Sequence, residues 1–189
     1  MKKLPMLHQF TCDGVEMIVG TTLSLYIRGI TAGANAFQKG GGGNFLCMPN
    51  NPIYATTEDA PNNDRAKLRA TGLFGNLFPP FQPLYDSRED ITCAVCRAPR
   101  RSTVLMVPGR NLCPTEAWTL EYQGYLAAPR ITLERAEFIC VDNSPEGYPG
   151  TAGHRPGHSE LHPVESECEG LPCEPYVANH ELTCAVCTI

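Results

Sequence analysis

Ten cysteines in a chain of 189 residues limit what this protein can fold into more than any other feature of its sequence. Cytosolic thiols are kept reduced and are rarely this numerous, so an even number at this density indicates an oxidising compartment and disulfides. The alternative is metal, because Cys93 with Cys96 and Cys184 with Cys187 form two Cys-x-x-Cys pairs that could share a zinc ion. We favour disulfides, since structural zinc pairs usually lie closer in sequence and the other cysteines would remain unexplained.

The cysteines belong to an internal repeat. Segments of the first half recur in the second half in the same order, and both halves close on Thr-Cys-Ala-Val-Cys. The matches are Cys12 with Cys113, residues 25–29 with 120–124, 45–47 with 138–140, and 92–96 with 183–187. The offset between matching residues shrinks smoothly along the chain, as small insertions require. We therefore predict two homologous, disulfide-rich modules in tandem, residues 1–97 and 98–189.

The composition predicts that both modules are all-β. Glycine and proline each contribute 17 residues, too many for a mostly helical chain and too few for a disordered one. Short β-branched or alternating apolar runs, bounded by turn residues, predict strands. These runs cover residues 22–27, 45–48, 102–107, 118–123 and 138–141. No apolar run is long enough to span a membrane, and the net charge of −5 argues against a nucleic-acid partner.

Three other segments carry weaker patterns. Residues 59–70 hint at a helix, with Pro61 in its first turn. Residues 72–85 are apolar but contain three prolines, which predicts an extended arm that packs on this chain or on another. Residues 147–163 are rich in glycine and proline, and we expect them to form a long surface loop.

The residues around the centre of the chain resemble a known family. They are Cys96-Arg-Ala-Pro, the predicted strand 104–107, Asn111-Leu-Cys113-Pro114, Trp118 and Gly124-Tyr125. This pattern is similar to the junction between the two halves of the C-terminal non-collagenous domain of type IV collagen, and to its relatives in the short-chain, spongin-like collagens of invertebrates. In that family each half begins with a Cys-Pro turn, passes through a strand into Gly-Tyr and closes on Cys-x-Val-Cys.

The resemblance covers most of the chain and implies a pairing for all ten cysteines. The first cysteine of each half would join the last of its Cys-x-x-Cys, and the second would join the first. The implied disulfides are Cys12–Cys96, Cys47–Cys93, Cys113–Cys187 and Cys140–Cys184, with Cys168–Cys173 as a short local loop. The first half departs from the family pattern, because it lacks the short-loop pair and has Asp13 after its first cysteine.

The resemblance also implies assembly rather than catalysis. We expect a secreted structural protein of the extracellular matrix that forms homo-oligomers, as trimers, by exchanging β elements between copies. The spacing of polar residues assembles no nucleophile, base and oxyanion-binding group, so we expect neither an enzyme nor a cofactor. The sequence contains no Gly-X-Y repeat, so we expect either an excised domain or a stand-alone member of the family.

A second hypothesis is a secreted ligand-binding module, lectin-like or glycosaminoglycan-binding. Its candidate surface is a basic cluster that could bind sulfated glycans or other matrix proteins, although such a run is more often a solvated face. The cluster consists of Arg97, Arg100, Arg101 and Arg110.

Three histidines and one tryptophan complete the candidates. His154, His158 and His162 follow one another at intervals of four, but the surrounding glycines and proline argue against a helix. We therefore favour a solvated loop over a metal site for these histidines. Trp118 aligns with Leu23 of the first half, so we expect it in the core rather than stacked on a sugar.

Overall fold

The computed structural model describes residues 24–55, 64–74, 89–153 and 157–189, and within these ranges the chain forms strands and no helix. The strands are β1 (Ser24–Ala34), β2 (Leu46–Pro49), β3 (Leu68–Leu73), β4 (Thr92–Arg97), β5 (Val104–Pro108), β6 (Thr119–Ala128), β7 (Ile139–Asp142), β8 (Ser159–Pro163) and β9 (Thr183–Thr188). The prediction of an all-β fold is therefore confirmed for the described ranges. None of their segments forms a helix with the length and hydrophobicity needed to cross a bilayer.

Strand β1 organises the first half of the molecule. Both β2 and β4 pair with it in antiparallel fashion, and a bulge between Leu25 and Ile27 interrupts the ladder with β4. At Gly29 the backbone of β2 passes so close that a Cβ atom would overlap the carbonyl oxygen of Met48. Only glycine fits at this position without moving the backbone.

Strand β6 organises the second half in the same way. Both β7 and β9 pair with it in antiparallel fashion, and a bulge lies between Leu120 and Tyr122. The backbone of β7 passes Gly124 so closely that a Cβ atom there would overlap the carbonyl oxygen of Val141. Strand β5 extends this part of the sheet by pairing with β9.

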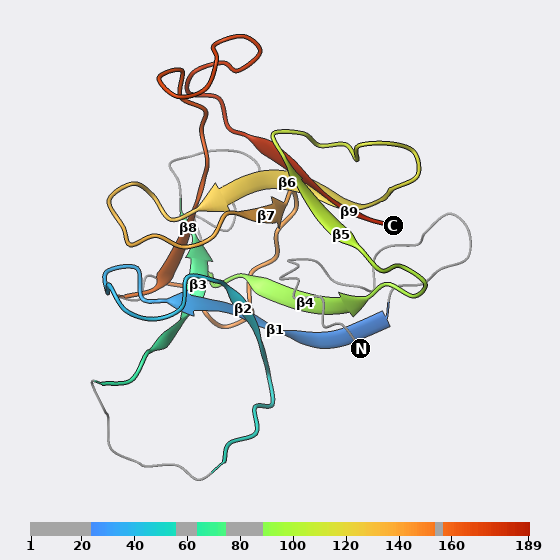
Figure 1. The fold of residues 1–189 in the computed structure, drawn as a ribbon. Helices are drawn as coiled ribbons and strands as arrows, with labels where there is room; N and C mark the ends of the chain where they lie inside the picture. Colours follow the sequence, from blue (N-terminus) through green and yellow to red (C-terminus); the bar gives the residue numbers. More distant parts are fainter. Residues whose placement is uncertain (1–23, 56–63, 75–88, 154–156) are drawn as a thin grey trace.

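Strands β3 and β8 join the two halves. Strand β3 pairs with β1, β8 pairs with β6, and residues 71–73 run parallel to residues 159–161. The sheet follows the order β2-β1-β3-β8-β6-β9-β5, with β4 branching from β1 and β7 from β6. Figure 1 shows β1, β2 and β4 in the lower part of the molecule, β5, β6, β7 and β9 in the upper part, and β3 and β8 between them.

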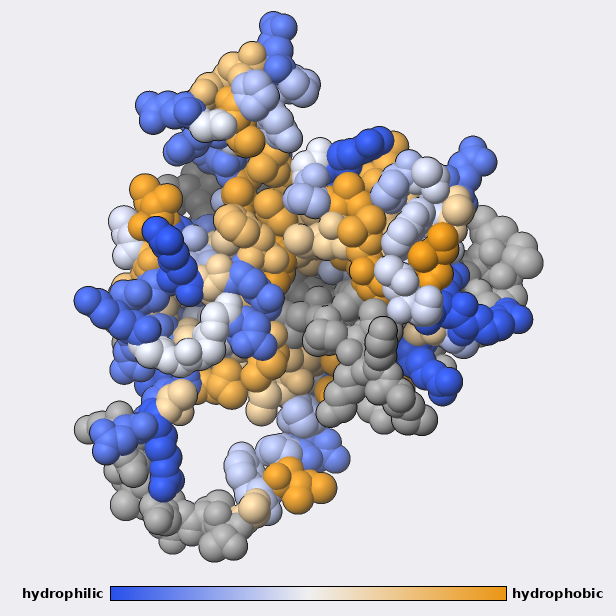
Figure 2. All heavy atoms as spheres, viewed as in Figure 1, coloured by the Kyte–Doolittle hydropathy of each residue, from blue (hydrophilic) through white to orange (hydrophobic). Residues whose placement is uncertain are grey.

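One cluster of buried side chains extends across both halves. It contains Phe45, Leu73 and Ile91 of the first half together with Ala127, Ile139, Val141 and Leu161 of the second. A second buried cluster, built around Tyr122 and Val186, lies between β6, β7 and β9. Figure 2 shows hydrophobic residues gathered over the strands, with hydrophilic residues on the surrounding loops. Burial of each large side chain contributes about 1.5–3 kcal/mol, so the shared core couples the stability of the two halves.

Three segments fold differently from the sequence-based expectation. The hint of a helix over residues 59–70 is wrong at its C-terminal end, where Leu68 to Ala70 pair with β1. The predicted surface loop over residues 147–163 is wrong where Ser159–Pro163 form β8 and pair with β3. In both places pairing with a strand distant in sequence overrides a local pattern. The predicted arm over residues 72–85 is wrong at its N-terminal end, where Gly72 and Leu73 belong to β3 and pair with β8. Residues 59–63, and residues 75–85 of the predicted arm, lie outside the described ranges.

Candidate functional site

Disulfides close the strand framework of the two halves. Among the described cysteines they are Cys47–Cys93, Cys113–Cys187, Cys140–Cys184 and Cys168–Cys173, which are the pairings that the resemblance implies for these eight residues. The paired Cα atoms lie between 5.2 and 5.9 Å apart, within the usual range. Cys96 is also disulfide-bonded. Cys12 lies outside the described residues, and so does the predicted pair that contains it.

Two of these disulfides occupy equivalent places in the two halves. Cys47–Cys93 joins β2 to β4, the strands that pair with β1, and Cys140–Cys184 joins β7 to β9, the strands that pair with β6. Their Cα distances are 5.6 and 5.7 Å, and they span 46 and 44 residues of sequence. In each half, a disulfide thus joins two strands that both pair with the same neighbouring strand, β1 in the first half and β6 in the second.

The loop that follows β7 packs against the first half. The N–H of Tyr148 donates to the carbonyl oxygen of Asp90 (2.6 Å), and the N–H of Thr92 donates to that of Glu146 (3.0 Å). The Tyr148 hydroxyl also donates to Oδ1 of Asn50 (3.0 Å) beside a groove of about 640 Å³. Backbone hydrogen bonds therefore reinforce the junction that the shared core establishes.

The histidine segment lies against the same junction. His158 is 6% exposed, with Nδ1 3.6 Å from Oδ1 of Asp90, so the expectation of a solvated position is wrong for this residue. Nε2 of His162 lies 3.1 Å from Oε2 of Glu160. Burial lowers the pKa of His162, and the neighbouring Glu160 carboxylate opposes that shift. Both imidazole rings pack on the ring of Phe74.

Two other candidate positions are less informative. His154 lies outside the described residues, and the described ones contain no group of three or more His, Cys, Asp or Glu side chains that could hold a metal ion. Trp118 is half-buried and directly precedes β6. Its backbone N–H donates to the carbonyl oxygen of Thr115 (3.1 Å).

The side chain of Arg101 forms its contacts inside the second half. Its side chain is only 15% exposed and forms an ion pair with the buried carboxylate of Glu121. It also donates to Oγ1 of Thr188 (3.0 Å), whose hydroxyl donates in turn to Glu121. The charge of Arg101 is therefore compensated within the fold.

The other arginines of the basic cluster are exposed but do not lie together. Arg97 ends β4, and Arg100 follows in a turn with a φ of 62°. Arg110 lies past the far end of β5, and a five-residue strand separates it from this turn by roughly 15 Å. The structure thus leaves Arg97 and Arg100 as one exposed cationic site and Arg110 as another.

A buried tyrosine and a carboxylate lie where β6 meets β7. The Tyr122 hydroxyl donates to the carbonyl oxygen of Cys140 (2.9 Å), and burial raises its pKa strongly. Burial also raises the pKa of Asp142, whereas the hydrogen bond that its Oδ1 accepts from the N–H of Ser144 (2.7 Å) lowers it. These contacts hold polar groups at the edge of the second core cluster and do not assemble a catalytic arrangement.

A cavity of about 460 Å³ opens where the β1–β2 connection faces the segment after β6. The glycine run of residues 40–43 lines one side of it. In the sequence this run is only a glycine tract without a collagen period, and no local pattern indicates that another loop faces it.

Comparison of the chain with models of protein families, with characterised proteins and with solved structures finds no match in any of the three. The function must therefore be argued from the residues themselves.

Proposed function

We propose that this protein is a secreted structural component of the extracellular matrix that assembles with copies of itself into trimers and has no catalytic role. The proposal follows the resemblance to the C-terminal non-collagenous domain of type IV collagen. The observation that carries it is the equivalent closure of the two halves by Cys47–Cys93 and Cys140–Cys184. Frameworks with this density of disulfides are typical of oxidising, extracellular environments.

The proposal includes a tandem duplication. The two halves share local features that the pairing of their strands alone does not require, and these features support the duplication. Gly29 and Gly124 meet the neighbouring backbone in the same way, and each central strand carries a bulge at the matching position. The N–H of Thr31 donates to Ile91, and that of Leu126 donates to Leu182, both at 2.9 Å.

Large apolar side chains that are exposed to solvent in the single chain support assembly. Ile53 is 98% exposed and Tyr54 is 76% exposed in the segment after β2. Burial of such a pair against another copy would remove apolar area from water, which is favourable by about 25 cal/mol per Å². Strand β5 also ends the sheet, and an edge strand is a ready partner for a strand of another copy.

Light scattering coupled to size-exclusion chromatography tests the assembly. We expect a trimer that persists on dilution, and we expect Ile53→Asp combined with Tyr54→Asp to shift it towards monomer. Ile131→Asp is the matched control, because Ile131 is fully exposed in a different segment. A wild-type protein that remains monomeric at every concentration would contradict the proposal.

A glycosaminoglycan-binding module is the second candidate, and the exposure of Arg97 and Arg100 favours it. Retention on a heparin column should fall with salt, because it depends on unpaired cationic side chains. Arg97→Ala combined with Arg100→Ala should reduce retention, whereas Arg110→Ala should change it less. Unchanged retention of the double variant would argue against this surface.

A further inference from the structure

The cavity of about 460 Å³ has the features of a small-molecule site, and it is separate from the surfaces discussed for assembly. Its walls are the β1–β2 connection, the segment after β6 and the start of β8. Ligand pockets commonly measure about 300–1,000 Å³, so its size suits a small ligand or one residue of a larger one.

Hydrogen bonds within the chain hold the two walls together. The N–H of Glu134 donates to the carbonyl oxygen of Ala36 (3.1 Å), and that of Glu137 donates to Gly43 (2.8 Å). The Glu137 carboxylate then accepts the N–H of Phe45 (2.8 Å). These hydrogen bonds fix the shape of the cavity. Binding of a ligand would therefore cost less conformational entropy than binding to mobile loops.

The glycine run leaves one wall bare. At Gly40 and Gly43 a Cβ atom would meet no other heavy atom within 4 Å, and neither residue has the positive φ that disfavours side chains. Only Gly41, with a φ of 114°, has a conformation that calls for glycine. Packing therefore does not require glycine at positions 40 and 43, and the absence of side chains there leaves the peptide groups of this wall uncovered.

Buried polar groups along the cavity have unused hydrogen-bonding capacity. Ser159 is 4% exposed, and its hydroxyl makes no hydrogen bond to any residue that the structure describes. Asn35 is 8% exposed and uses Oδ1 to accept the N–H of Phe37 (3.0 Å), which leaves its amide nitrogen as a donor. Neither the Ser159 hydroxyl nor the Asn35 amide nitrogen is among the fully buried side-chain atoms that lack a partner. A ligand that forms hydrogen bonds with both groups would therefore replace water at them rather than satisfy an orphaned atom.

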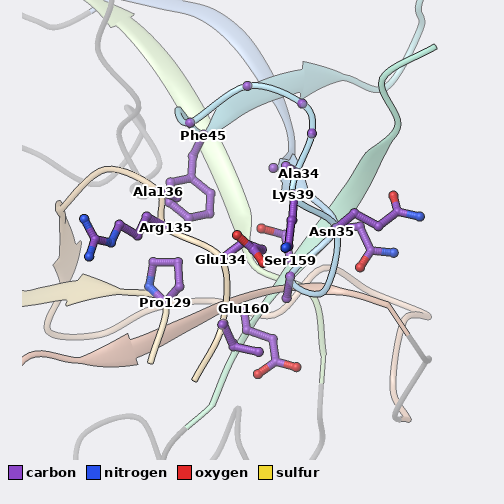
Figure 3. Close-up of a pocket in the computed structure, with 18 of the residues that line it drawn as sticks. Ala34, Asn35, Lys39, Phe45, Pro129, Glu134, Arg135, Ala136, Ser159 and Glu160 are labelled. Carbon is purple, nitrogen blue, oxygen red and sulfur yellow. The ribbon is translucent and has the colours of Figure 1, made fainter. Parts of the chain in front are cut away.

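The lining also indicates the chemical class of the ligand. Lys39 and Arg135 are matched by Glu134 and Glu160, so the lining favours neither an anion nor a cation. Figure 3 shows Phe45, Ala136 and Pro129 on one side of the cavity, and Lys39, Asn35 and Ser159 on the other. A neutral molecule with many hydroxyl groups and one apolar face matches both sides, because hydroxyls both donate and accept.

We propose that this cavity binds a neutral sugar residue. The test is a titration of the 15N-labelled full chain, followed by NMR, with the methyl glycosides of glucose, galactose, mannose and N-acetylglucosamine. We expect saturable shifts confined to the amides of residues 40–43, 134–136 and 159. A parallel titration with dextran and mannan distinguishes the source, since a response to the polymers alone identifies a residue within a chain rather than a terminal one.

Variants make the proposal falsifiable. Gly43→Leu should fill the cavity and raise Kd by on the order of tenfold or more, and Ser159→Ala should raise it about fivefold. Gly170→Leu is the matched control, because a Cβ at Gly170 also meets nothing within 4 Å but lies away from the cavity. Absence of saturable shifts with every probe, or equal Kd values for Gly43→Leu and Gly170→Leu, would overturn the proposal. Either result leaves the oligomeric state, and hence the proposed assembly, untouched.

Discussion

Strands β1 and β6 are flanked by equivalent partners, whereas the segments that follow them differ. After β1 the chain enters a glycine-rich connection, and after β6 it enters one that contains Pro129 and Leu133. Even the ends of the equivalent strands differ, since Pro49 lies opposite Gly29 where Asp142 lies opposite Gly124. Close backbone contacts and disulfides therefore constrain the strand framework in both halves, whereas the connections between strands differ and can form a site.

The glycines provide the strongest test of this comparison. Gly29→Ala and Gly124→Ala should each destabilise the protein by on the order of 5 kcal/mol, because a Cβ atom at either place overlaps a backbone carbonyl. Such a loss is comparable to the whole stability of a domain, so folded protein should be scarce. Gly40→Ala is the control and should change the free energy of unfolding by less than about 1 kcal/mol. If only one of Gly29→Ala and Gly124→Ala were tolerated, the two glycines would not have equivalent roles in the two halves.

Removal of disulfides tests the same comparison with a smaller effect. Replacement of Cys47 and Cys93 by alanine, or of Cys140 and Cys184, should cost about 4 kcal/mol in each case, because the closed loops span 46 and 44 residues. The Cys168–Cys173 disulfide closes only a short loop, so replacement of both cysteines should cost about 2 kcal/mol. Urea unfolding of the three variants measures these losses, and unequal costs for the first two would contradict the account.

The Arg101–Glu121 ion pair lies within the second half. Arg101→Ala should cost about 3 kcal/mol at neutral pH, because it leaves the Glu121 carboxylate buried and uncompensated. Addition of Glu121→Gln should restore stability to within about 1 kcal/mol of the wild type. The two variants can be compared by urea unfolding, and a double variant as unstable as the single one would show that Arg101 acts through packing.

Asp142 gives the smallest predicted effect. Because its pKa is raised in the folded protein, the ionised carboxylate favours the unfolded state above that pKa. Asp142→Asn should therefore raise Tm by about 1 °C at neutral pH and leave it unchanged below the unfolded pKa of about 3.9. Glu167→Gln on an exposed loop removes the same charge and serves as the control. A gain that persists in acid would contradict the electrostatic explanation.

The sequence predicted the part of the fold that depends on local pattern. Each of the five predicted strands overlaps one of β1, β2, β5, β6 and β7, because alternation and turn residues mark them. The two Cys-Ala-Val-Cys segments form a clear repeat, but such short runs have no clear period, so the sequence does not predict that they form β4 and β9. Strand β8, with His162 and two other polar residues, has no local strand pattern at all.

The candidate sites were less predictable for the same reason. Burial of His158 and pairing of Arg101 both depend on residues far away in sequence, Asp90 and Glu121 respectively. The cavity depends on two connections that face each other only after β1 and β6 are joined through β3 and β8. A sequence pattern can indicate which residues are unusual, but it does not show which of them meet.

Native mass spectrometry of the unreduced protein is the decisive test of a disulfide-closed chain that assembles with itself, because one spectrum measures both assembly and oxidation. We expect a trimer in which each chain is lighter by about ten hydrogens than its reduced form, as a complete disulfide framework requires. A monomer would contradict the proposed assembly. Chains that retain free thiols together with bound zinc would contradict the extracellular, disulfide-closed framework itself.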